Sequence, residues 1–161
     1  FFWHVMNCWG WATWANRWQH YEKNVEKVFK LFSPAMINHF DFDNSGVFWK
    51  QVIGNKEGEL NTWAIFWYAS IYLKNGLCLN PSKSFVLNIG FDGSGIHSGK
   101  FGGNHFQTLR ETPITNFEQE IVESELAVER IKTYYRSQKR SLYIRIINKL
   151  SRWTLGKNLI R

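Results

Sequence analysis

The sequence predicts an α/β domain that is rich in helix and ends in a basic amphipathic helix. Three observations support this prediction: apolar residues recur at helical spacing, short apolar runs flank turn residues, and basic residues gather near the C-terminal end. The 161 residues are 44% hydrophobic and 20% charged, a composition typical of a folded domain. Nine Trp, thirteen Phe and six Tyr make the chain unusually aromatic. We expect most of these rings in the core, although such rings also stack on sugar and base faces.

The first half of the chain is predicted to be largely helical after an apolar start. Phe1–Val5 has the character of a strand, and its abrupt apolar beginning suggests that the chain starts in mid-domain. Ser33-Pro34 should end a helix, Thr62 should cap one, and Gly76 should end that helix in the left-handed conformation. The predicted helices are 12–21, 24–32, a short or irregular one at 48–53, and 63–74.

The second half is predicted to hold short strands, a glycine-rich loop and two helices. Strands are expected at 77–79 and 85–89, around the turn at Pro81, and a loop with six glycines spans 90–103. Thr115 and Asn116 should cap a long helix over 117–135, and a basic amphipathic helix should follow over 142–153. We divide the chain into residues 1–104 and a helical basic extension, residues 105–161.

The positive charge is concentrated in that extension. The formal net charge is +7, ten of the twenty Lys and Arg residues lie from Arg130 onward, and no Asp or Glu follows Glu129. A basic amphipathic helix with Trp153 suits an anionic membrane surface, and it equally suits a helix that packs on the domain with a solvated basic face. Nucleic acid is not expected as a partner, because the aromatic residues that could stack on bases lie elsewhere in the chain.

The cysteines and the apolar runs bear on location. Cys8 and Cys78 do not have metal-ligand spacing, and the simplest interpretation is two reduced thiols in a cytosolic protein. The longest apolar run, Trp63–Leu73, is too short to span a bilayer. We therefore expect a cytoplasmic protein, peripheral on the inner face of the membrane if the basic tail binds there.

Two motifs carry possible metal or phosphate chemistry. Asp41-Phe42-Asp43-Asn44-Ser45-Gly46 matches half of a calcium loop, but its twelfth position is Val52 rather than Glu. No buried apolar strand leads into it, so a glycosyltransferase-type Asp-x-Asp is not expected either, and local Asp and Asn turn bonds are the better account. Asn88-Ile89-Gly90-Phe91-Asp92-Gly93-Ser94-Gly95-Ile96-His97 is a strand feeding a glycine-rich turn. Such a turn can cradle a phosphate, although a surface loop is an alternative.

Two groups of segments resemble a known family. Cys8-Trp9-Gly10-Trp11-Ala12-Thr13-Trp14-Ala15-Asn16-Arg17-Trp18 looks like the Trp-rich signature of bacterial family 2-like glycosyltransferases. Trp63-Ala64-Ile65-Phe66-Trp67-Tyr68-Ala69-Ser70, then Asn75-Gly76-Leu77, Pro81 and the 88–97 segment, resemble the later segments of the same proteins in order and spacing. The resemblance covers about residues 1 to 98.

The resemblance implies the C-terminal portion of a GT-A fold, a Rossmann-like mixed sheet with helices on both faces. It implies inverting transfer of a sugar from a nucleotide-sugar donor to an acceptor hydroxyl, in assembly of cell-surface polysaccharide or lipopolysaccharide, with Mn²⁺ or Mg²⁺ at the diphosphate. The nucleotide- and metal-binding half would precede Cys8, so residues 1–104 would form the acceptor side. Little activity and little or no metal binding are then expected of this chain alone.

The resemblance also implies roles for particular residues. His97 matches a His that contacts metal or diphosphate, and Glu59 and Asp92 are the nearby carboxylates that could act as the base. Many relatives carry Asp where this chain has Ala64, which leaves the base unassigned. Close relatives are expected to carry Arg where this chain has Phe66, so one phosphate or acceptor contact would be altered. The residues expected to bind substrate are Trp9, Trp11, Trp14, Trp63, Gly93, Ser94 and Gly95.

A second hypothesis is a non-catalytic module, derived from that fold, that binds carbohydrate or a membrane surface. Under the first hypothesis the partners are a nucleotide-sugar donor and a glycan or lipid-linked acceptor. A domain that lacks its other half would expose apolar surface, so we also expect an oligomer or poor solubility.

Overall fold

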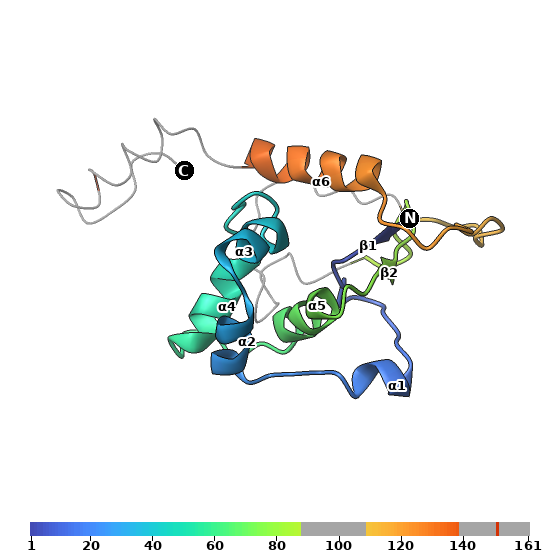
Figure 1. Cartoon of the computed structure of the whole chain (residues 1–161). Helices are drawn as coiled ribbons and strands as arrows, with labels where there is room; N and C mark the ends of the chain where they lie inside the picture. Colours follow the sequence, from blue (N-terminus) through green and yellow to red (C-terminus); the bar gives the residue numbers. More distant parts are fainter. Residues whose placement is uncertain (88–108, 139–150, 152–161) are drawn as a thin grey trace.

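The computed structural model describes residues 1–87, 109–138 and 151, and in these residues the protein is mainly helical. In Figure 1, α2, α3 and α4 gather beside α5, whereas α6 and α1 lie on opposite sides of the molecule. The part of the chain that is described holds β1 (Phe2–Trp3), α1 (Ala15–Trp18), α2 (Val25–Leu31), α3 (Pro34–Phe40), α4 (Trp49–Lys56), α5 (Ala64–Leu73), β2 (Cys78–Leu79) and α6 (Glu125–Gln138).

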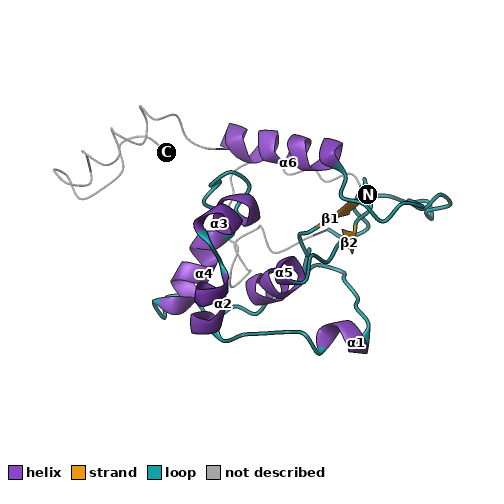
Figure 2. Ribbon diagram, viewed as in Figure 1, coloured by secondary structure: helices purple, strands orange, loops and turns teal. Residues whose placement is uncertain are grey.

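A short sheet joins the start of the chain to two distant segments. β1 and β2 pair antiparallel, with Phe2 opposite Leu79 and Trp3 opposite Cys78. Glu123 forms an isolated parallel bridge with Phe2, so the residues before α6 extend this ladder. Figure 2 shows both strands at one end of the helical body. The strands predicted near residues 1–5 and 77–79 are confirmed. Phe85–Leu87 is not a strand, and residues 88 and 89 lie outside the described residues.

The centre of the fold is α5, which is apolar on every side. All six residues from Ile65 to Ser70 are buried, as expected for a helix surrounded by the domain. Ser70 is the polar member of this run, and both of its hydrogen-bonding roles are satisfied. Its hydroxyl donates to the Phe66 carbonyl at 2.7 Å and accepts the Glu22 backbone N–H at 3.0 Å. The helix predicted for 63–74 is therefore confirmed as the core of the domain.

The predicted ends of α5 need two corrections. Thr62 does not cap the helix, because Trp63 occupies the N-cap position without a side-chain hydrogen bond. The Thr62 hydroxyl instead accepts from the Asn55 side chain at 2.9 Å, and the Thr62 N–H donates to the Asn55 amide oxygen. At the other end the left-handed residue is Asn75, with φ of 51°, rather than Gly76. Asn tolerates that conformation almost as Gly does.

Helix α3 was not expected from the sequence; it begins at Pro34, directly after the Ser33 position where a helix was expected only to end. The Asn24 side chain caps α2 by accepting the Lys27 N–H at 3.0 Å. Ser33 then caps α3 by accepting the Met36 N–H at 3.3 Å, with Pro34 in the first helical turn. Proline at this position loses no helical hydrogen bond, because the first N–H groups of a helix have no partner within it. The Ser-Pro pair is therefore a helix start as well as a helix stop.

The helices at the two edges are shorter than predicted. α1 covers only Ala15–Trp18 of the predicted 12–21, because Trp11 before it and Tyr21 after it both pack on the Trp18 ring. α6 begins at Glu125, so the residues from 117 to 123 precede it as loop, and Ser124 accepts the Ala127 N–H at 3.3 Å. The prediction that Thr115 and Asn116 cap this helix is wrong. The basic helix predicted for 142–153 lies outside the described residues, apart from Ser151.

The turn between α3 and α4 is organised by one buried carboxylate. Asp41 is 4% exposed and accepts the backbone N–H groups of Gly46 at 2.7 Å, Phe48 at 2.8 Å and Trp49 at 3.0 Å. These bonds fix the start of α4 and hold three consecutive residues in the left-handed region, Phe42, Asp43 and Asn44. The local turn bonds expected here are confirmed.

α6 packs on the same core as the residues before 104. Val128 is buried in the central cluster, with Ile131 and Tyr135 packed against it. At the exposed edge of this contact, Asp43 pairs with Lys132 at 3.4 Å and with Arg136 at 2.8 Å. Among the described residues we find no helix with the length and hydropathy needed to cross a bilayer.

Candidate functional site

Five aromatic rings from three separate segments meet at one place on the molecule. We call this group the aromatic cluster; its members are Trp11, Trp18, Tyr21, Trp63 and Trp67. Trp11 comes from the loop after β1, Trp18 ends α1, and Trp63 opens α5. The Trp11 ring centroid lies 5.3 Å from that of Trp63 and 5.7 Å from that of Trp18. Trp11 and Trp63, which are 52 positions apart in the sequence, thus come together in the fold.

The cluster combines a buried base with exposed outer rings. Trp67 is 4% exposed and meets Trp18 edge-on at a centroid distance of 5.0 Å. Trp18 and Trp63 are 38% and 40% exposed, so part of each ring is open to a ligand. Rings that are fixed on one side and exposed on the other can bind the apolar face of a sugar without ordering new side chains.

Tyr21 adds a polar group to the cluster. Its ring stacks on Trp18 with centroids 4.7 Å apart and planes 7° apart. Its hydroxyl oxygen is buried and has no hydrogen-bond partner among the described residues. Burial raises the pKa of Tyr21, so the hydroxyl stays protonated at neutral pH and can donate as well as accept. A buried hydroxyl without a partner costs free energy that a ligand hydroxyl could recover.

The loop that carries the first tryptophans passes close to the segment that leads into the glycine-rich turn. Gly10 has a φ of +63°, and a Cβ added to it would lie 2.4 Å from Val86 Cγ2. Only glycine fits that conformation and that contact together. This contact fixes the Trp-rich loop against the segment that precedes residue 88.

The sequence-predicted site residues divide into three groups. Trp11 and Trp63 lie in the aromatic cluster, whereas Trp9 and Trp14 flank it in sequence at 47% and 76% exposure. Glu59 is exposed in the loop between α4 and α5. In the same loop the Asn61 side-chain oxygen accepts a hydrogen bond from Lys23 Nζ at 2.9 Å. Asp92, Gly93, Ser94, Gly95 and His97 lie outside the described residues.

Sequence analysis did not select Trp18, Tyr21 and Trp67 as site residues. Trp18 stands in the Trp-rich segment, and its helical spacing from Trp14 suggested a shared core face. The structure places the Trp14 ring outward instead, at 76% exposure. The pairing of Trp18 with Trp63 and Trp67 depends on how α1 meets α5, which no local pattern reveals.

The acidic turn offers no free metal-binding carboxylate pair. Asp41 is occupied by backbone N–H groups, and Asp43 is paired with Lys132 and Arg136. Burial raises the pKa of Asp43, but the hydrogen bonds and positive charges of Arg136 and Lys132 outweigh it, and the net pKa lies below its ordinary value. Within residues 1–87, 109–138 and 151, no three His, Cys, Asp or Glu side chains come together as a metal site would require.

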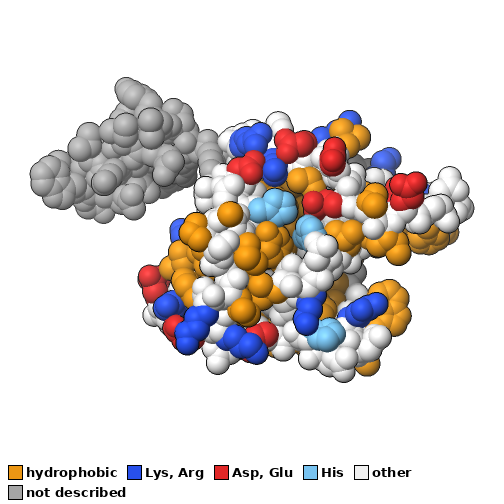
Figure 3. Space-filling model, viewed as in Figure 1, with side chains coloured by type: hydrophobic (Ala, Val, Ile, Leu, Met, Phe, Trp, Pro, Cys, Tyr) orange, Lys and Arg blue, Asp and Glu red, His pale blue; other side chains and the backbone are white. Residues whose placement is uncertain are grey.

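A separate polar cluster holds β1 against the end of α5. The Nδ1–H of His4 donates to the Gly76 carbonyl at 2.7 Å, since a carbonyl can only accept. Its other nitrogen, Nε2, faces Glu123 Oε1 at 4.0 Å. His39 Nδ1 lies 3.0 Å from the Tyr72 hydroxyl. These contacts tie three elements together; Figure 3 shows histidine and acidic side chains side by side on this face.

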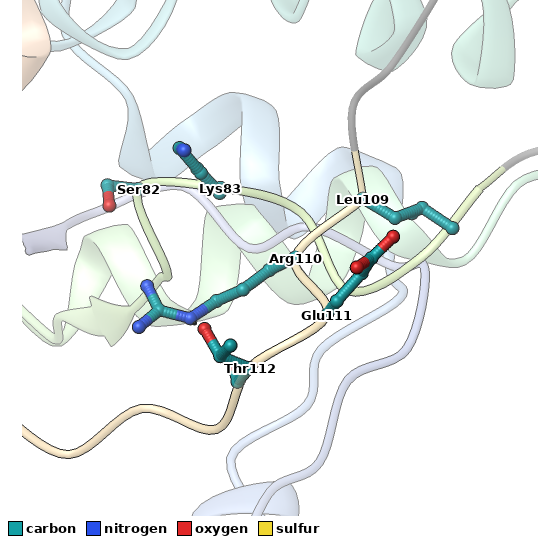
Figure 4. A pocket seen from close by; sticks show the side chains of 6 residues that line it. All are labelled: Ser82, Lys83, Leu109, Arg110, Glu111 and Thr112. Atoms are coloured by element: carbon teal, nitrogen blue, oxygen red, sulfur yellow. Dashed lines mark hydrogen bonds between the residues drawn. The ribbon is translucent and has the colours of Figure 1, made fainter.

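A shallow pocket of about 430 Å³ lies where the chain enters and leaves residues 88–108 (Figure 4). Its one arginine is committed locally: the Arg110 Nε–H donates to the Thr112 carbonyl at 2.8 Å, and the backbone N–H donates to Ser84 at 2.8 Å. None of the sequence-predicted site residues that the structure describes lines it. The lining residues are Ser82, Lys83, Leu109, Arg110, Glu111 and Thr112.

Comparisons with known proteins were made at three levels. No family model, no curated protein and no solved structure matches this chain.

Proposed function

We propose that this chain carries the acceptor-binding side of a GT-A-type glycosyltransferase that uses a nucleotide-sugar donor to build cell-surface polysaccharide or lipopolysaccharide. The observation that carries the proposal is the aromatic cluster. Three partly accessible Trp rings meet there beside the Tyr21 hydroxyl, which has no partner among the described residues. Rings and an unpaired hydroxyl are the groups that a sugar needs, because a sugar presents one apolar face and a rim of hydroxyls.

The proposed roles come from this arrangement and from the resemblance. Trp11 and Trp63 stack on the acceptor sugar, with Trp9 and Trp14 extending the surface beside them. The Tyr21 hydroxyl binds a hydroxyl of the same sugar and fixes its orientation. In the inverting reaction, the free acceptor hydroxyl attacks the anomeric carbon, its proton passes to a carboxylate, and the nucleoside diphosphate leaves. Glu59 and Asp92 are the candidates for that carboxylate.

The remaining roles are proposed from the resemblance alone. Gly93, Ser94 and Gly95 would close over the donor diphosphate, and His97 would contact the diphosphate or its Mn²⁺ or Mg²⁺. Acceptor recognition by the aromatic cluster does not depend on that ion.

The proposal is tested by sugar binding to the whole chain and to three variants. The probe is a printed array of oligosaccharides from bacterial polysaccharides and lipopolysaccharides, followed by calorimetry with the best-bound member. We expect Trp11→Ala and Trp63→Ala each to weaken binding at least about tenfold, which corresponds to roughly 1.4 kcal/mol. Tyr134→Ala, which removes a 52% exposed ring on α6, is the matched control and should bind as the parent does.

Tyr21→Phe separates a binding role from a structural one. Removing a buried hydroxyl that has no partner within the described part of the chain should leave the free energy of unfolding unchanged or higher. The same change should weaken sugar binding, because the ligand loses its hydrogen bond. Equal binding by the parent chain, Tyr21→Phe and Trp63→Ala, or no binding to any sugar, would rule the proposal out.

The second candidate is a non-catalytic module that binds carbohydrate or an anionic membrane surface. The concentration of Lys and Arg after Glu129 favours it. Turnover of UDP- or GDP-sugars with Mn²⁺ would contradict it. Sedimentation with anionic and neutral vesicles tests its membrane form, which requires retention on the anionic vesicles alone.

A further inference from the structure

The loop that leads into α6 is both apolar and acidic on its exposed side. Four of its apolar side chains are 57% to 74% exposed: Phe117, Ile121, Val122 and Leu126. Residues 117–126 contain four Glu and no Lys or Arg. We call these ten residues the acidic apolar strip. Figure 3 shows hydrophobic and acidic side chains together along this loop.

Three of the four carboxylates of the strip have no ion-pair partner within the part of the molecule that the structure describes; the fourth, Glu123, faces His4. Glu118, Glu120 and Glu125 are exposed, and none of them forms an ion pair with a described residue. Single exposed apolar side chains are ordinary. Four of them within ten residues, beside three carboxylates that have no ion pair in the described part of the chain, have the character of a binding surface. The partner that fits is a segment with apolar side chains and Lys or Arg.

This chain itself contains such a segment. Residues 139–161 hold seven Lys and Arg, no Asp or Glu, several Leu and Ile residues, and one Trp. They follow Gln138, the last residue of α6, whereas the strip lies at the other end of the helix and includes its first two residues. A helix of 14 residues is about 20 Å long, so the basic segment of one copy starts far from the strip of the same copy.

We infer that two copies of this chain form a closed dimer in which their α6 helices run antiparallel. Antiparallel pairing brings the end of one α6 against the beginning of the other. The basic segment after Gln138 of each copy then meets the acidic apolar strip of its partner. Each copy provides one basic segment and one strip, so the same contact forms twice. Both surfaces are then occupied, and assembly stops at two copies.

The charges along α6 fit this arrangement. Glu125 and Glu129 lie in its first half, and the basic residues Arg130, Lys132 and Arg136 come after them. Two antiparallel copies place the acidic start of one helix opposite the basic end of the other, whereas two parallel copies would place like charges together. Lys132 and Arg136 already pair with Asp43 of their own copy, so Arg130 is the basic residue of α6 that no ion pair holds within the described residues. The exposed Leu126 and Tyr134, at 64% and 52%, supply the apolar part of the contact. This inference is independent of the proposed glycosyltransferase function.

The test is the mass of the whole chain in solution as a function of concentration, measured by sedimentation equilibrium. The parent chain should change from one to two copies as concentration rises, and 1 M NaCl should weaken the dimer because salt screens exposed charges. The double variant Glu118→Lys/Glu120→Lys should raise the dimer dissociation constant roughly tenfold or more. Ile121→Ser should also raise it, through the apolar contact.

Matched controls separate this surface from general effects of charge. Glu57→Lys/Glu111→Lys makes the same change in charge at two exposed positions outside the strip and should leave the dimer intact. Arg145→Glu/Lys149→Glu/Arg152→Glu should be monomeric alone, yet form a mixed dimer with Glu118→Lys/Glu120→Lys. The inference would be overturned if the parent chain had the mass of one copy at every concentration, or if the two variants failed to associate when mixed.

Discussion

The Tyr68 hydroxyl donates a hydrogen bond of 2.9 Å to the backbone carbonyl of Phe40, and the two rings stack with centroids 4.1 Å apart. Phe40 is the last residue of α3, and Tyr68 lies in the middle of α5. The contact therefore anchors the end of one helix to the core of the fold. It also holds Asp41, the next residue, where its carboxylate can organise the turn.

Tyr68→Phe should destabilise the protein by about 1 to 3 kcal/mol, because it leaves the buried Phe40 carbonyl without this donor while the ring contact stays. Urea unfolding followed by circular dichroism measures the change. Tyr134→Phe removes an exposed hydroxyl and is the control, with an expected change near zero. A Tyr68→Phe variant as stable as the parent would show that the hydrogen bond contributes nothing net.

Gly10→Ala should be more damaging than an alanine at another left-handed glycine. At Gly58, with φ of +76°, nothing lies within 4 Å of an added Cβ, so alanine costs only the backbone strain, about 1 to 2 kcal/mol. At Gly10 the added Cβ also meets Val86, which should cost about 1 to 3 kcal/mol more. Urea unfolding of the two variants and of Gly10→Ala/Val86→Ala tests this. The excess cost should fall in the double variant; if it does not, the close contact is not its cause.

Asp43→Asn should remove a contribution to stability that depends on pH. Because the pKa of Asp43 in the folded protein lies below its ordinary value of 3.8, its ion pairs with Arg136 and Lys132 stabilise the fold above that pH. The contribution is lost as the pH falls through the lower, folded-state pKa. We expect the free energy of unfolding of the parent to exceed that of Asp43→Asn by about 0.5 to 1 kcal/mol at pH 7, and the difference to shrink as the pH falls through the folded-state pKa. Glu57→Gln, an exposed acidic control, should show no such difference in urea titrations.

Cys78 should be a slow thiol in the folded protein. Burial raises its pKa to about 11, and burial also raises the pKa of Cys8 despite an opposing backbone hydrogen bond. In a Cys8→Ser variant, alkylation of Cys78 by iodoacetamide at pH 9 should be roughly fiftyfold slower in the native state than in urea, because few native thiols are ionised. Equal rates would mean that β2 opens readily. Both cysteines are free, as expected from the sequence.

Local patterns predicted the parts of the fold that local chemistry decides. The helix around Ile65 is apolar enough to be recognised without a partner, and the Asn24 cap marks the start of α2. Two details of the helix ends were predicted wrongly. Ser33-Pro34 ends α2 and also begins α3, and Asn75 rather than Gly76 takes the left-handed conformation after α5. The start of α6 was placed too early, since the pairing of Phe2 with Glu123 keeps the preceding residues extended.

The candidate site could be predicted only in part. Trp11 and Trp63 were each selected from the Trp-rich segments of the sequence, without knowledge that their rings meet in the structure. Tyr21 and Trp67 could not be selected, because their importance comes from contacts between α1, the following loop and α5. Helical spacing also puts Trp14 and Trp18 on one face, whereas ring contacts hold Trp18 in the aromatic cluster at 38% exposure and leave Trp14 at 76%.

The ladder around β1 has a consequence for how the protein forms during synthesis. Phe2 finds one strand partner at Leu79 and another at Glu123, far along the chain. A ribosome adds residues one by one, so the aromatic first strand must wait for more than a hundred others before its pairing is complete. Until then it is an unpaired apolar edge. Nascent chains that end before Glu123 should therefore bind chaperones more strongly than chains that extend beyond α6.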